Sequence, residues 1–475
     1  MKKIILILSI LFVPQLISAQ SVPNTFQNGE VIDATKFNEN FKIVSSGIRK
    51  GTVDCDAGES INEKLKEYNH LKISGICNEN IIIDYTTRPD GPGSDYDNAT
   101  KVKSYIALIG ANGNSVDGIA SNDSDKDVIY ISGGPILLKI DGLKISGGEN
   151  GISSNWGAFV AIRSSIIENN QNDGVRIRRG MGYINGSTLR NNRNGLVAIN
   201  GANIQIVNST IQNNDDHGIG IWLGSNAYIG NKPEFDESGN RDFTRPRGNI
   251  ITGSRTGVSV ADTSYARLIG NTITCYENKG IWASESSTLD LGVNHDRADL
   301  TDTTNPLNYS HSNYATNKLT YGNLIDGAAC SGVDREDWQN GVDVRESTAL
   351  RMYRNVIKNN SANGVRAEAQ SSIVLGGGNE IRDNDDNGFD LSGSTLNQWD
   401  WDQEHEPSAV ESNGRDAFNL NYSELNLRGG WVWDDDSNSV TSKTHKFIIS
   451  DHRRGIAAHR NSSVTLQRVE IKDNT

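Results

Sequence analysis

The sequence is poor in the residues that usually fill a large core. Only 35% of its residues are hydrophobic and 7% are aromatic, with 3 methionines and 9 prolines against 48 glycines. Beyond the first 19 residues there is no long apolar run, which predicts that the mature chain has no membrane anchor. The sequence also lacks a P-loop, a dinucleotide-binding motif, a nucleophile elbow and an HExxH motif. It therefore gives no support for the enzyme classes that these motifs mark.

Positive charge is also in short supply. The formal net charge is −13, and losing two positive charges, Lys2 and Lys3, with the signal sequence makes it −15. An acidic chain with scattered basic residues is a poor nucleic-acid binder, so no nucleic-acid partner is expected. Such a chain can still bind an acidic polymer where its basic groups line one groove.

The first residues are typical of an export signal. Lys2 and Lys3 precede an apolar stretch over residues 4–12, and Ser18 and Ala19 complete a small-residue cleavage site. This pattern predicts a signal peptide over residues 1–19, too short to span a membrane. The mature chain is therefore expected to be secreted, periplasmic or at the cell surface.

A glycine followed by an apolar residue recurs at a near-fixed interval. Gly151, Gly174, Gly195 and Gly218 each begin such a pair, at intervals of 23, 21 and 23 residues. Further pairs begin at Gly257, Gly280, Gly341, Gly364, Gly388 and Gly455. Each unit holds three short apolar runs of period two, separated by Asn, Asp and Gly. These features predict three strands and three turns per unit, which is one coil of a solenoid.

The repeat predicts an all-β right-handed parallel β-helix over residues 51–475, with 12 coils or more. Recurring pairs such as Asn169-Asn170 and Asn191-Asn192 are expected at one turn, where stacked side-chain amides can bond along the axis. The pattern resembles the right-handed parallel β-helix superfamily, which includes pectate-lyase-like proteins. The resemblance covers roughly residues 75–475 and is specific for fold, whereas function depends on the site.

Two short segments precede the repeat. Residues 20–50 form a leader in which Phe37, Phe41, Val44 and Ile48 have helical spacing; we predict docking or self-association through this leader, with a simple linker as the alternative. Residues 60–68 read as a short amphipathic helix. This helix resembles the one that caps the N-terminal end of such solenoids, where the first coil would otherwise expose its core.

The four cysteines of an exported chain predict disulfides. Cys55 and Cys77 flank the first candidate element, whereas Cys275 and Cys330 fall at nearby turns of neighbouring coils. We predict the pairs Cys55–Cys77 and Cys275–Cys330. A zinc site is not expected, because no CxxC motif and no paired histidines accompany them.

Insertions in a solenoid often gather on its binding face. Two long insertions, over residues 231–248 and 293–323, follow the first strand of a coil, and a third is expected over 398–412. From coil to coil, the outward residues of that first strand are Ala161, Tyr183, Gln205, Tyr228, Arg267, Asp290 and Arg351. Coils lie about 4.8 Å apart, so Arg267, Asp290 and Arg351 are expected to form an ion-paired row with Tyr353 beside it.

The resemblance implies that this strand and its loops hold a groove where acidic sugars are cleaved by β-elimination. That reaction must neutralise a uronate carboxylate and remove the adjacent C5 proton. We assign Arg267 and Arg351 to carboxylate binding or to the base. Tyr228 or His295 is assigned to proton transfer, and Asp290 to orienting an arginine or holding Ca²⁺. The predicted substrate-binding residues are Arg245, Tyr309, His311, Tyr353 and Trp399. The alternative is that Arg267, Asp290 and Arg351 form a solvated surface ladder.

Other motifs are interpreted structurally. Residues 214–218 resemble fragments of polygalacturonase motifs, but their contiguous Asp215-Asp216 pair is interpreted as turn residues. His217 with Gly218 and Ile219 is similar to a short motif of alginate-epimerase-like β-helices. Outward tryptophans such as Trp222 and Trp282 can stack on sugars or pack loops.

Two functions follow from the sequence. The first is an exported carbohydrate-active enzyme on an acidic, uronate-containing polysaccharide, by β-elimination or epimerisation, with Ca²⁺ as a candidate cofactor. The second is a non-catalytic secreted or surface glycan-binding protein that uses the same face as an adhesin. A cleft with converging titratable groups favours the first, and a flat aromatic face the second.

Overall fold

The structure is a computed structural model, and it describes residues 48–84, 105–132, 136–231, 247–292, 321–398, 408–428, 431–434, 439–444 and 447–475. The predicted signal peptide and almost all of the leader segment lie outside these residues, so both stay predictions. In the part that the structure describes, no helix is long and apolar enough to span a membrane.

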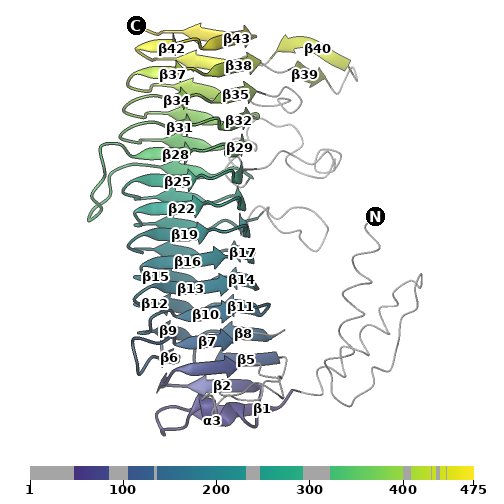
Figure 1. Cartoon of the computed structure of the whole chain (residues 1–475), viewed down its shortest axis with the longest axis vertical. Helices are drawn as coiled ribbons and strands as arrows, with labels where there is room; N and C mark the ends of the chain where they lie inside the picture. Colours follow the sequence, from purple (N-terminus) through teal and green to yellow (C-terminus); the bar gives the residue numbers. More distant parts are fainter. Residues whose placement is uncertain are drawn as a thin grey trace, which may run out of the picture.

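Short parallel strands stack into three long sheets that share one axis (Figure 1). Sheet A has 15 strands, in the order β1 (Lys50–Asp54), β2 (His70–Ser74), β5 (Tyr105–Gly110), β8 (Leu137–Asp141), β11 (Phe159–Arg163), β14 (Met181–Asn185), β17 (Asn203–Val207), β20 (Asn226–Gly230), β23 (Tyr265–Ile269), β26 (Thr288–Leu291), β29 (Ala349–Met352), β32 (Ser372–Leu375), β35 (Thr395–Gln398), β38 (Glu424–Arg428) and β43 (Ser463–Gln467).

Sheet B has 14 strands, in the order β3 (Ile76–Asn78), β6 (Gly118–Ala120), β9 (Lys144–Ser146), β12 (Ile166–Glu168), β15 (Thr188–Arg190), β18 (Thr210–Gln212), β21 (Ile250–Thr252), β24 (Thr272–Thr274), β27 (Leu324–Asp326), β30 (Val356–Lys358), β33 (Glu380–Arg382), β36 (Ala409–Glu411), β41 (Phe447–Ser450) and β44 (Val469–Lys472).

Sheet C has 13 strands, in the order β4 (Ile81–Asp84), β7 (Ile129–Ser132), β10 (Ile152–Asn155), β13 (Asp173–Arg178), β16 (Asn194–Ile199), β19 (His217–Ile221), β22 (Thr256–Val260), β25 (Lys279–Ala283), β28 (Asn340–Val344), β31 (Val365–Glu368), β34 (Phe389–Ser392), β37 (Asp416–Asn421) and β42 (Arg454–His459).

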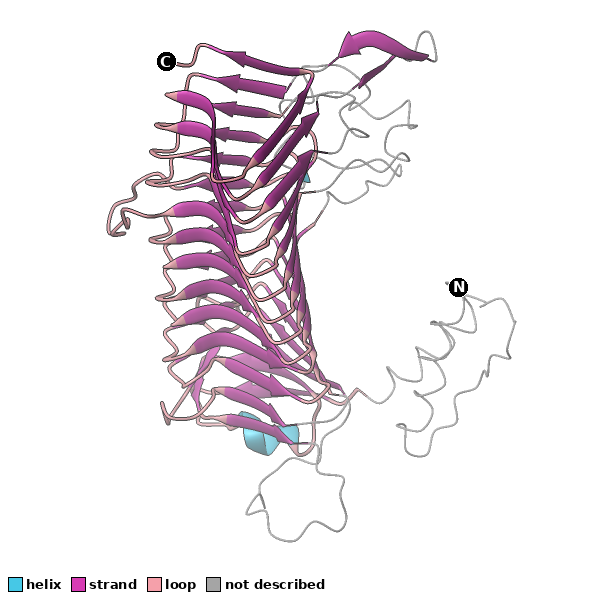
Figure 2. Cartoon of the chain, turned by 45° about the horizontal axis from the view of Figure 1, so that its top comes forward, coloured by secondary structure: helices cyan, strands magenta, loops and turns pink. Residues whose placement is uncertain are grey.

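From β2 onward the chain visits sheets A, B and C in turn, and each strand pairs in parallel with the strand one coil earlier and one coil later. Figure 2 shows these strands stacked along the axis. Only β39 (Trp431–Asp434) and β40 (Ser439–Thr444) depart from this order among the described strands, as an antiparallel hairpin between β38 and β41. The fold is the predicted right-handed parallel β-helix, with the number of coils that the repeat indicated.

The core is a column of apolar side chains inside the three sheets. On sheet A, alternate residues point inward, so that Ile162, Ile184, Ile206 and Ile229 stack in register and are almost fully buried. Near the C-terminal end the same column holds aromatic rings, and Phe389 and Phe418 stack with their centroids 5.0 Å apart. Burying each such side chain stabilises the fold by about 1.5–3 kcal/mol.

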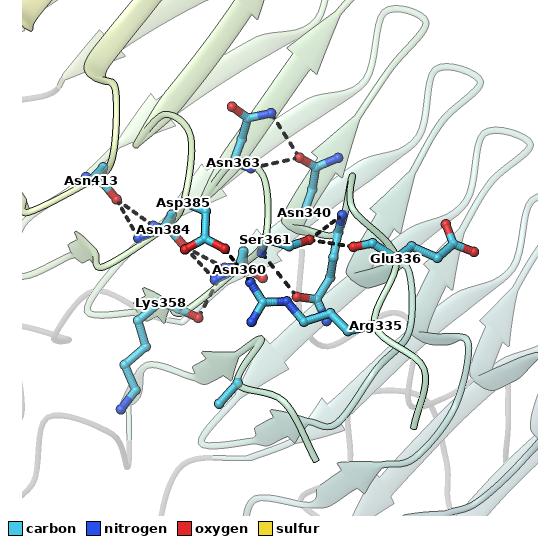
Figure 3. A network of polar contacts seen from close by, with 12 residues as sticks. Arg335, Glu336, Asn340, Lys358, Asn360, Ser361, Asn363, Asn384, Asp385 and Asn413 are labelled. Carbon is cyan, nitrogen blue, oxygen red and sulfur yellow. Dashed lines mark hydrogen bonds and ion pairs between the residues drawn. The ribbon is translucent and has the colours of Figure 1, made fainter. Parts of the chain in front are cut away.

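The predicted amide ladder lies at the turn between sheets B and C. The backbone N–H and side-chain amide of Asn170 both donate to Asn192 Oδ1, at 3.0 and 2.9 Å, and Asn192 donates to Asn214 in the same way. Figure 3 shows a second stretch, in which Asn360 donates to Asn384 and Asn384 to Asn413. The preceding asparagines, such as Asn169 and Asn191, take the left-handed backbone that the turn requires.

A second ladder, which the sequence reasoning missed, lies at the turn between sheets A and B. Asn249, Asn271, Asn323, Asn355 and Asn379 are buried there, and each of the first four donates its backbone N–H and its side-chain amide to the next. Four of the five follow a glycine in the sequence, and this recurring Gly-Asn pair is a signal that could have found the ladder. Both ladders satisfy buried backbone groups that no strand can reach.

Both predicted disulfides are present. Cys55 pairs with Cys77 and Cys275 with Cys330, with Cα atoms 4.8 and 5.4 Å apart. The first links the residue after β1 to β3 of the next coil, and the second ties the turn after β24 to the segment between β27 and β28. Helix α3 (Ile61–Leu65) is shorter than predicted; Ser60 accepts a hydrogen bond from the backbone of Glu63, and Ile61 and Leu65 are buried. Its capping role stays a prediction.

All three predicted insertions separate a sheet A strand from the following sheet B strand. They lie between β20 and β21, β26 and β27, and β35 and β36, and most of their residues are outside the described part. The third insertion was predicted to extend to residue 412, but β36 occupies Ala409–Glu411, because Val410 returns to the apolar column. A further excursion that was not predicted runs over residues 327–339, between β27 and β28; in Figure 1 it is the green loop on the left, level with β25 and β28.

Candidate functional site

Sheet A carries the row of side chains predicted from the sequence. Tyr228 pairs with Arg267, Arg267 with Asp290, and Asp290 with Arg351, so four consecutive coils contribute one outward residue each. Their inward neighbours, such as Ala266 and Leu289, are buried. The predicted register is therefore confirmed, whereas the catalytic roles assigned to these residues stay predictions.

Asp290 is the centre of the contacts in this row. Its Oδ2 accepts a 2.8 Å hydrogen bond from the Tyr265 hydroxyl, and Arg351 Nε lies 3.1 Å from Oδ1 as an ion pair without hydrogen-bond geometry. Burial and the Asp290 carboxylate raise the pKa of Tyr265, which therefore keeps its proton. Arg267 forms no ion pair with a described carboxylate, and the Tyr228 ring is 49% exposed.

The other predicted site residues are not gathered in this row. Tyr353 follows β29, and its ring lies against Gly376 of the next coil, where an added Cβ would come within 2.1 Å of a ring atom. Arg245, His295, Tyr309, His311 and Trp399 lie outside the described residues. Among the predicted site residues that the structure describes, only Tyr228, Arg267, Asp290 and Arg351 therefore lie together in one row.

Sheet C carries a second group of polar side chains, which sequence reasoning did not assemble. In one outward row, His217 pairs with Thr256, Thr256 with Lys279, and Lys279 with Asn340. In the adjacent outward row, the chain places Gly220, Ser259, Trp282 and Asp343 in register. Ser259 and Asp343 are fully buried although they point away from the core, so this face is covered by its own side chains.

His217 lies in a mainly positive environment. Burial lowers the pKa of its imidazole, and Arg255, Arg193 and Lys279 act in the same direction, whereas Asp216, 3.7 Å from Nε2, opposes them. Its Nδ1 is buried and has no hydrogen-bond partner in the described part of the chain. The imidazole is therefore neutral near pH 7. Because Nδ1 is buried, Nε2 is the ring nitrogen that a ligand could reach.

Two tryptophans lie on this face, one beside His217 and one beside Lys279. The Trp222 ring packs edge-on against His217, with centroids 5.3 Å apart, and its indole N–H donates a 2.9 Å hydrogen bond to Ser259 Oγ. The Lys279 ammonium lies 5.9 Å from the centre of the Trp282 ring. Two flat apolar surfaces therefore flank a neutral base and a cation.

Lys279 is a cation of this face that forms no ion pair with a described carboxylate. Burial lowers its pKa, whereas the Asp343 carboxylate opposes this shift. Asp343 is instead held by Arg345, whose Nε and Nη2 donate 2.8 Å hydrogen bonds to its two oxygens. Lys279 and His217 are two coils apart, or about 10 Å along the axis.

The 327–339 segment folds back beside this face. The Glu336 N–H donates to the Glu277 carbonyl at 3.0 Å, and Glu336 Oε1 lies 4.0 Å from Arg255 Nε. Further along the chain, Arg335 forms an ion pair with Asp385 at 2.8 Å, and Ser361 Oγ donates to the Glu336 carbonyl (Figure 3). Together with the Cys275–Cys330 disulfide, these contacts fix the segment as a wall at the edge of sheet C.

A signal for the sheet C row was present in the sequence. Each residue of the row immediately precedes the glycine of a Gly-apolar pair, so aligning the pairs also aligns His217, Thr256, Lys279 and Asn340. Asp215 and Asp216 lie in the turn before β19, as predicted. Within the described residues no group of three or more His, Cys, Asp or Glu side chains could hold a metal ion, and the predicted Ca²⁺ stays untested.

The fold and the arrangement of its polar rows define a right-handed β-helix protein with candidate sites on the outer faces of its sheets. Residues 98–233 match a family model described as right handed beta helix region. This match and the three parallel sheets confirm the predicted resemblance to the right-handed parallel β-helix superfamily.

No curated protein shows significant sequence similarity to the chain. Among solved structures, the A-module of a mannuronan C-5 epimerase of Azotobacter vinelandii is 12% identical, with 90% of this chain and 93% of that chain covered and a TM-score of 0.45. A periplasmic alginate epimerase is 11% identical, with 77% of each chain covered and a TM-score of 0.36. A pectate lyase is 11% identical, with 66% of this chain and 80% of that chain covered and a TM-score of 0.33. These are similarities of chain path and carry no conclusion about chemistry.

Proposed function

We propose that the chain is an exported carbohydrate-active enzyme that removes the C5 proton of a uronate residue in an acidic polysaccharide, at the sheet C face. The observation that carries this proposal is the neutral, half-buried His217 imidazole within the field of Arg193, Arg255 and Lys279. A positive surround attracts a carboxylate, and a neutral imidazole can accept a proton.

Each group of the sheet C face would have its own role in removing the C5 proton. Lys279 would bind the uronate carboxylate and stabilise the negative charge that develops when the C5 proton leaves. His217 would accept that proton at Nε2, because its Nδ1 is buried, and the Trp222 and Trp282 rings would stack against neighbouring sugar rings.

Two reactions share this first step. In β-elimination, the electron pair of the C5–H bond forms the C4–C5 double bond, and the C4–O4 bond breaks with its electron pair leaving on O4, which then takes up a proton. In epimerisation, C5 instead regains a proton from the opposite face and no bond to O4 is broken. Both leave the carboxylate in place, so the same cation serves both reactions.

The test is turnover of polygalacturonate, alginate and a glycosaminoglycan, with and without Ca²⁺. Elimination is followed by the ultraviolet absorbance of the unsaturated product, and epimerisation by deuterium uptake at C5 in heavy water. We expect His217→Ala to lower kcat about 100-fold or more, with Lys279→Met also strongly impaired. His459→Ala is the matched control, because His459 is an exposed histidine at the end of β42 in the same sheet.

The sheet A row is the second candidate location, with Arg267 and Arg351 in the roles assigned from the sequence. Turnover that survives His217→Ala but is lost in Arg267→Ala or Arg351→Ala would move the catalytic site to sheet A. Retention on an acidic polymer, with neither product nor deuterium uptake, would instead support the non-catalytic glycan-binding protein.

A further inference from the structure

The outer face of sheet B has an uncharged centre. Three consecutive strands, β18, β21 and β24, contribute two outward residues each in register, and their inward neighbours Ile211, Ile251 and Ile273 are fully buried. We call the six outward residues the sheet B centre; they are Thr210, Gln212, Ile250, Thr252, Thr272 and Thr274. None of them is charged, and Ile250 on the middle strand is 51% exposed. A flat surface of uncharged, mostly β-branched side chains is suited to packing against another sheet.

Charged residues flank this centre on both sides, and they do so in the same order. Toward the N-terminus, Glu168 pairs with Arg190 of the next strand, and their side chains form an ion pair with Nη2 2.6 Å from Oε2. Toward the C-terminus, Asp326 pairs with Lys358 of the next strand, with Nζ 3.2 Å from Oδ2. All four belong to one outward row. Along the axis, this row therefore reads acid, base, three uncharged residues, acid, base.

This order of charges is complementary to its own reverse. A two-fold axis along β21 would set a second copy face to face and antiparallel, so that β21 meets β21, β15 meets β27, and β12 meets β30. Arg190 would then face Asp326 of the second copy, and Glu168 would face Lys358 of the second copy. Each contact would occur twice, because the same surface is used by both chains. A two-fold axis along the solenoid would instead set each strand opposite itself, and none of these contacts would form.

The match continues in the adjacent outward row. Lys144 on β9 and Glu380 on β33 belong to the row of Ile250, and both lie four strands from β21. The same two-fold axis sets Lys144 opposite Glu380 of the second copy. Among the outward residues of the strands from β9 to β33, no charge would directly face a charge of its own sign. The register that centres on Ile250 is therefore favoured by the charges on both of its sides.

The size of this face is suited to a reversible contact. Four strand spacings on each side of β21 give a length of about 38 Å, but the strands are only three residues wide. Such a narrow face is at the low end of specific interfaces, which corresponds to a dissociation constant in the micromolar range. Sheets A and C, which carry the two candidate sites, point away from this contact.

We propose that sheet B is the interface of a symmetric dimer in which two copies of the chain lie antiparallel, with Ile250 at the two-fold axis. The uncharged centre supplies the dehydrated part of the contact, and the flanking charges fix its register. The proposal does not depend on the proposed function. It also differs from self-association through the leader segment, which is a separate prediction from the sequence.

The first test is sedimentation velocity of the full chain at concentrations from about 1 to 100 μM. The parent should shift from monomer to dimer over this range. Ile250→Arg would set two guanidinium groups against each other at the two-fold axis, so the dissociation constant should rise at least about tenfold. Met181→Arg is the matched control, because Met181 is an apolar residue of sheet A that is 49% exposed. Thermal unfolding verifies that both variants are folded.

The second test separates the proposed register from other effects of charge. Arg190→Glu and Asp326→Lys each place like charges at both symmetry-related contacts, so each variant alone should dimerise about tenfold more weakly or worse. In a mixture of the two variants, a dimer with one chain of each regains opposite charges at both contacts. The mixture should therefore dimerise like the parent, which a folding defect in either chain would not allow.

Four results would overturn the proposal. They are a parent that stays monomeric at every concentration, a dimer that persists unchanged in Ile250→Arg, an equal loss in Met181→Arg, and a mixture that dimerises no better than its components. A dimer that persists in Ile250→Arg would assign self-association to another part of the chain, such as the leader segment.

Discussion

The Trp222 ring lies across the backbone of Gly220, two residues earlier on strand β19. A Cβ added to Gly220 would come within 2.4 Å of a ring atom of Trp222, so only glycine leaves room for the ring in this position. The hydrogen bond from the indole to Ser259 then holds the ring against the next coil. The orientation of one aromatic surface of the candidate site therefore depends on the absence of a side chain beneath it.

Gly220→Ala is expected to displace the Trp222 ring and to raise KM for polymeric substrate more than it lowers kcat. The fold should lose about 1–3 kcal/mol, the usual cost of overpacking. Ser259→Ala keeps the space and removes only the hydrogen bond, so it should cost about 1 kcal/mol and change KM less. Tryptophan fluorescence and steady-state kinetics measure both effects; an unchanged KM in Gly220→Ala would show that the ring does not contact the substrate.

The lowered pKa of His217 predicts how stability depends on pH. The unfolded chain binds this proton at the ordinary histidine pKa of about 6.5, whereas the folded protein binds it only at lower pH. As the pH falls through that range, the unfolded state gains a proton that the folded state does not, so the free energy of unfolding decreases. Above that range this contribution to the pH dependence disappears.

Urea unfolding of the parent and of His217→Gln between about pH 5 and pH 8 measures this effect. The parent should lose more stability toward low pH than the variant, because glutamine does not titrate. Buried acids such as Asp173 and Asp390, whose pKa values are raised by burial, remain in both proteins and cancel in the comparison. Parallel curves would contradict the assigned environment of His217.

Asn192→Ala is expected to destabilise the fold by about 1–3 kcal/mol. The substitution removes the acceptor for two donors of Asn170 and leaves the Asn214 and Ile167 oxygens without its amide. Gln171→Ala is the control, because Gln171 is an exposed residue of the turn that holds Asn170 and its side chain forms no hydrogen bond within the described residues. Chemical denaturation that gives equal losses for both variants would show that the ladder contributes nothing specific.

Replacing Cys275 and Cys330 together by serine is expected to loosen the 327–339 segment locally. Hydrogen exchange of the Glu336 and Gln339 amides, which donate to Glu277 and Ser361, should become faster while the strands of sheet C stay protected. The same change at Cys55 and Cys77 should leave exchange in this segment unaltered. If hydrogen exchange of the Glu336 amide is unchanged in the variant without Cys275 and Cys330, the noncovalent contacts alone hold the 327–339 segment in place.

The repeat predicted most of the fold, because each coil obeys the same local rule. Period-two alternation on sheet A correctly separated inward residues such as Leu289 from outward ones such as Asp290, and the asparagine pairs correctly located one ladder. The helix predicted over residues 60–68 is shorter than expected, and the wall over 327–339 was not predicted, since its path depends on contacts between distant residues such as Arg335 and Asp385.

The candidate site was harder to predict than the fold. The Gly-apolar pairs draw attention to the inward residues. The residue before the glycine is asparagine in five of the ten pairs and changes to His217, Thr256 and Lys279 in three consecutive coils, with no type that repeats among these three. The pKa of His217 and the position of the Trp222 ring depend on burial and on side-chain conformation across several coils. The spacing of the repeat predicts neither the pKa of His217 nor the position of the Trp222 ring.

The in-register pairing of the sheets has a consequence for how such a site can change. Because every residue of a sheet faces one partner in the next coil, the separation between His217 and Lys279 along the axis is a whole number of coil spacings. Gaining or losing one repeat changes that separation by about 4.8 Å, and no smaller step is open to the backbone. Finer adjustment must come from the lengths of the side chains themselves, so substrates of different repeat length select among discrete arrangements of the same scaffold.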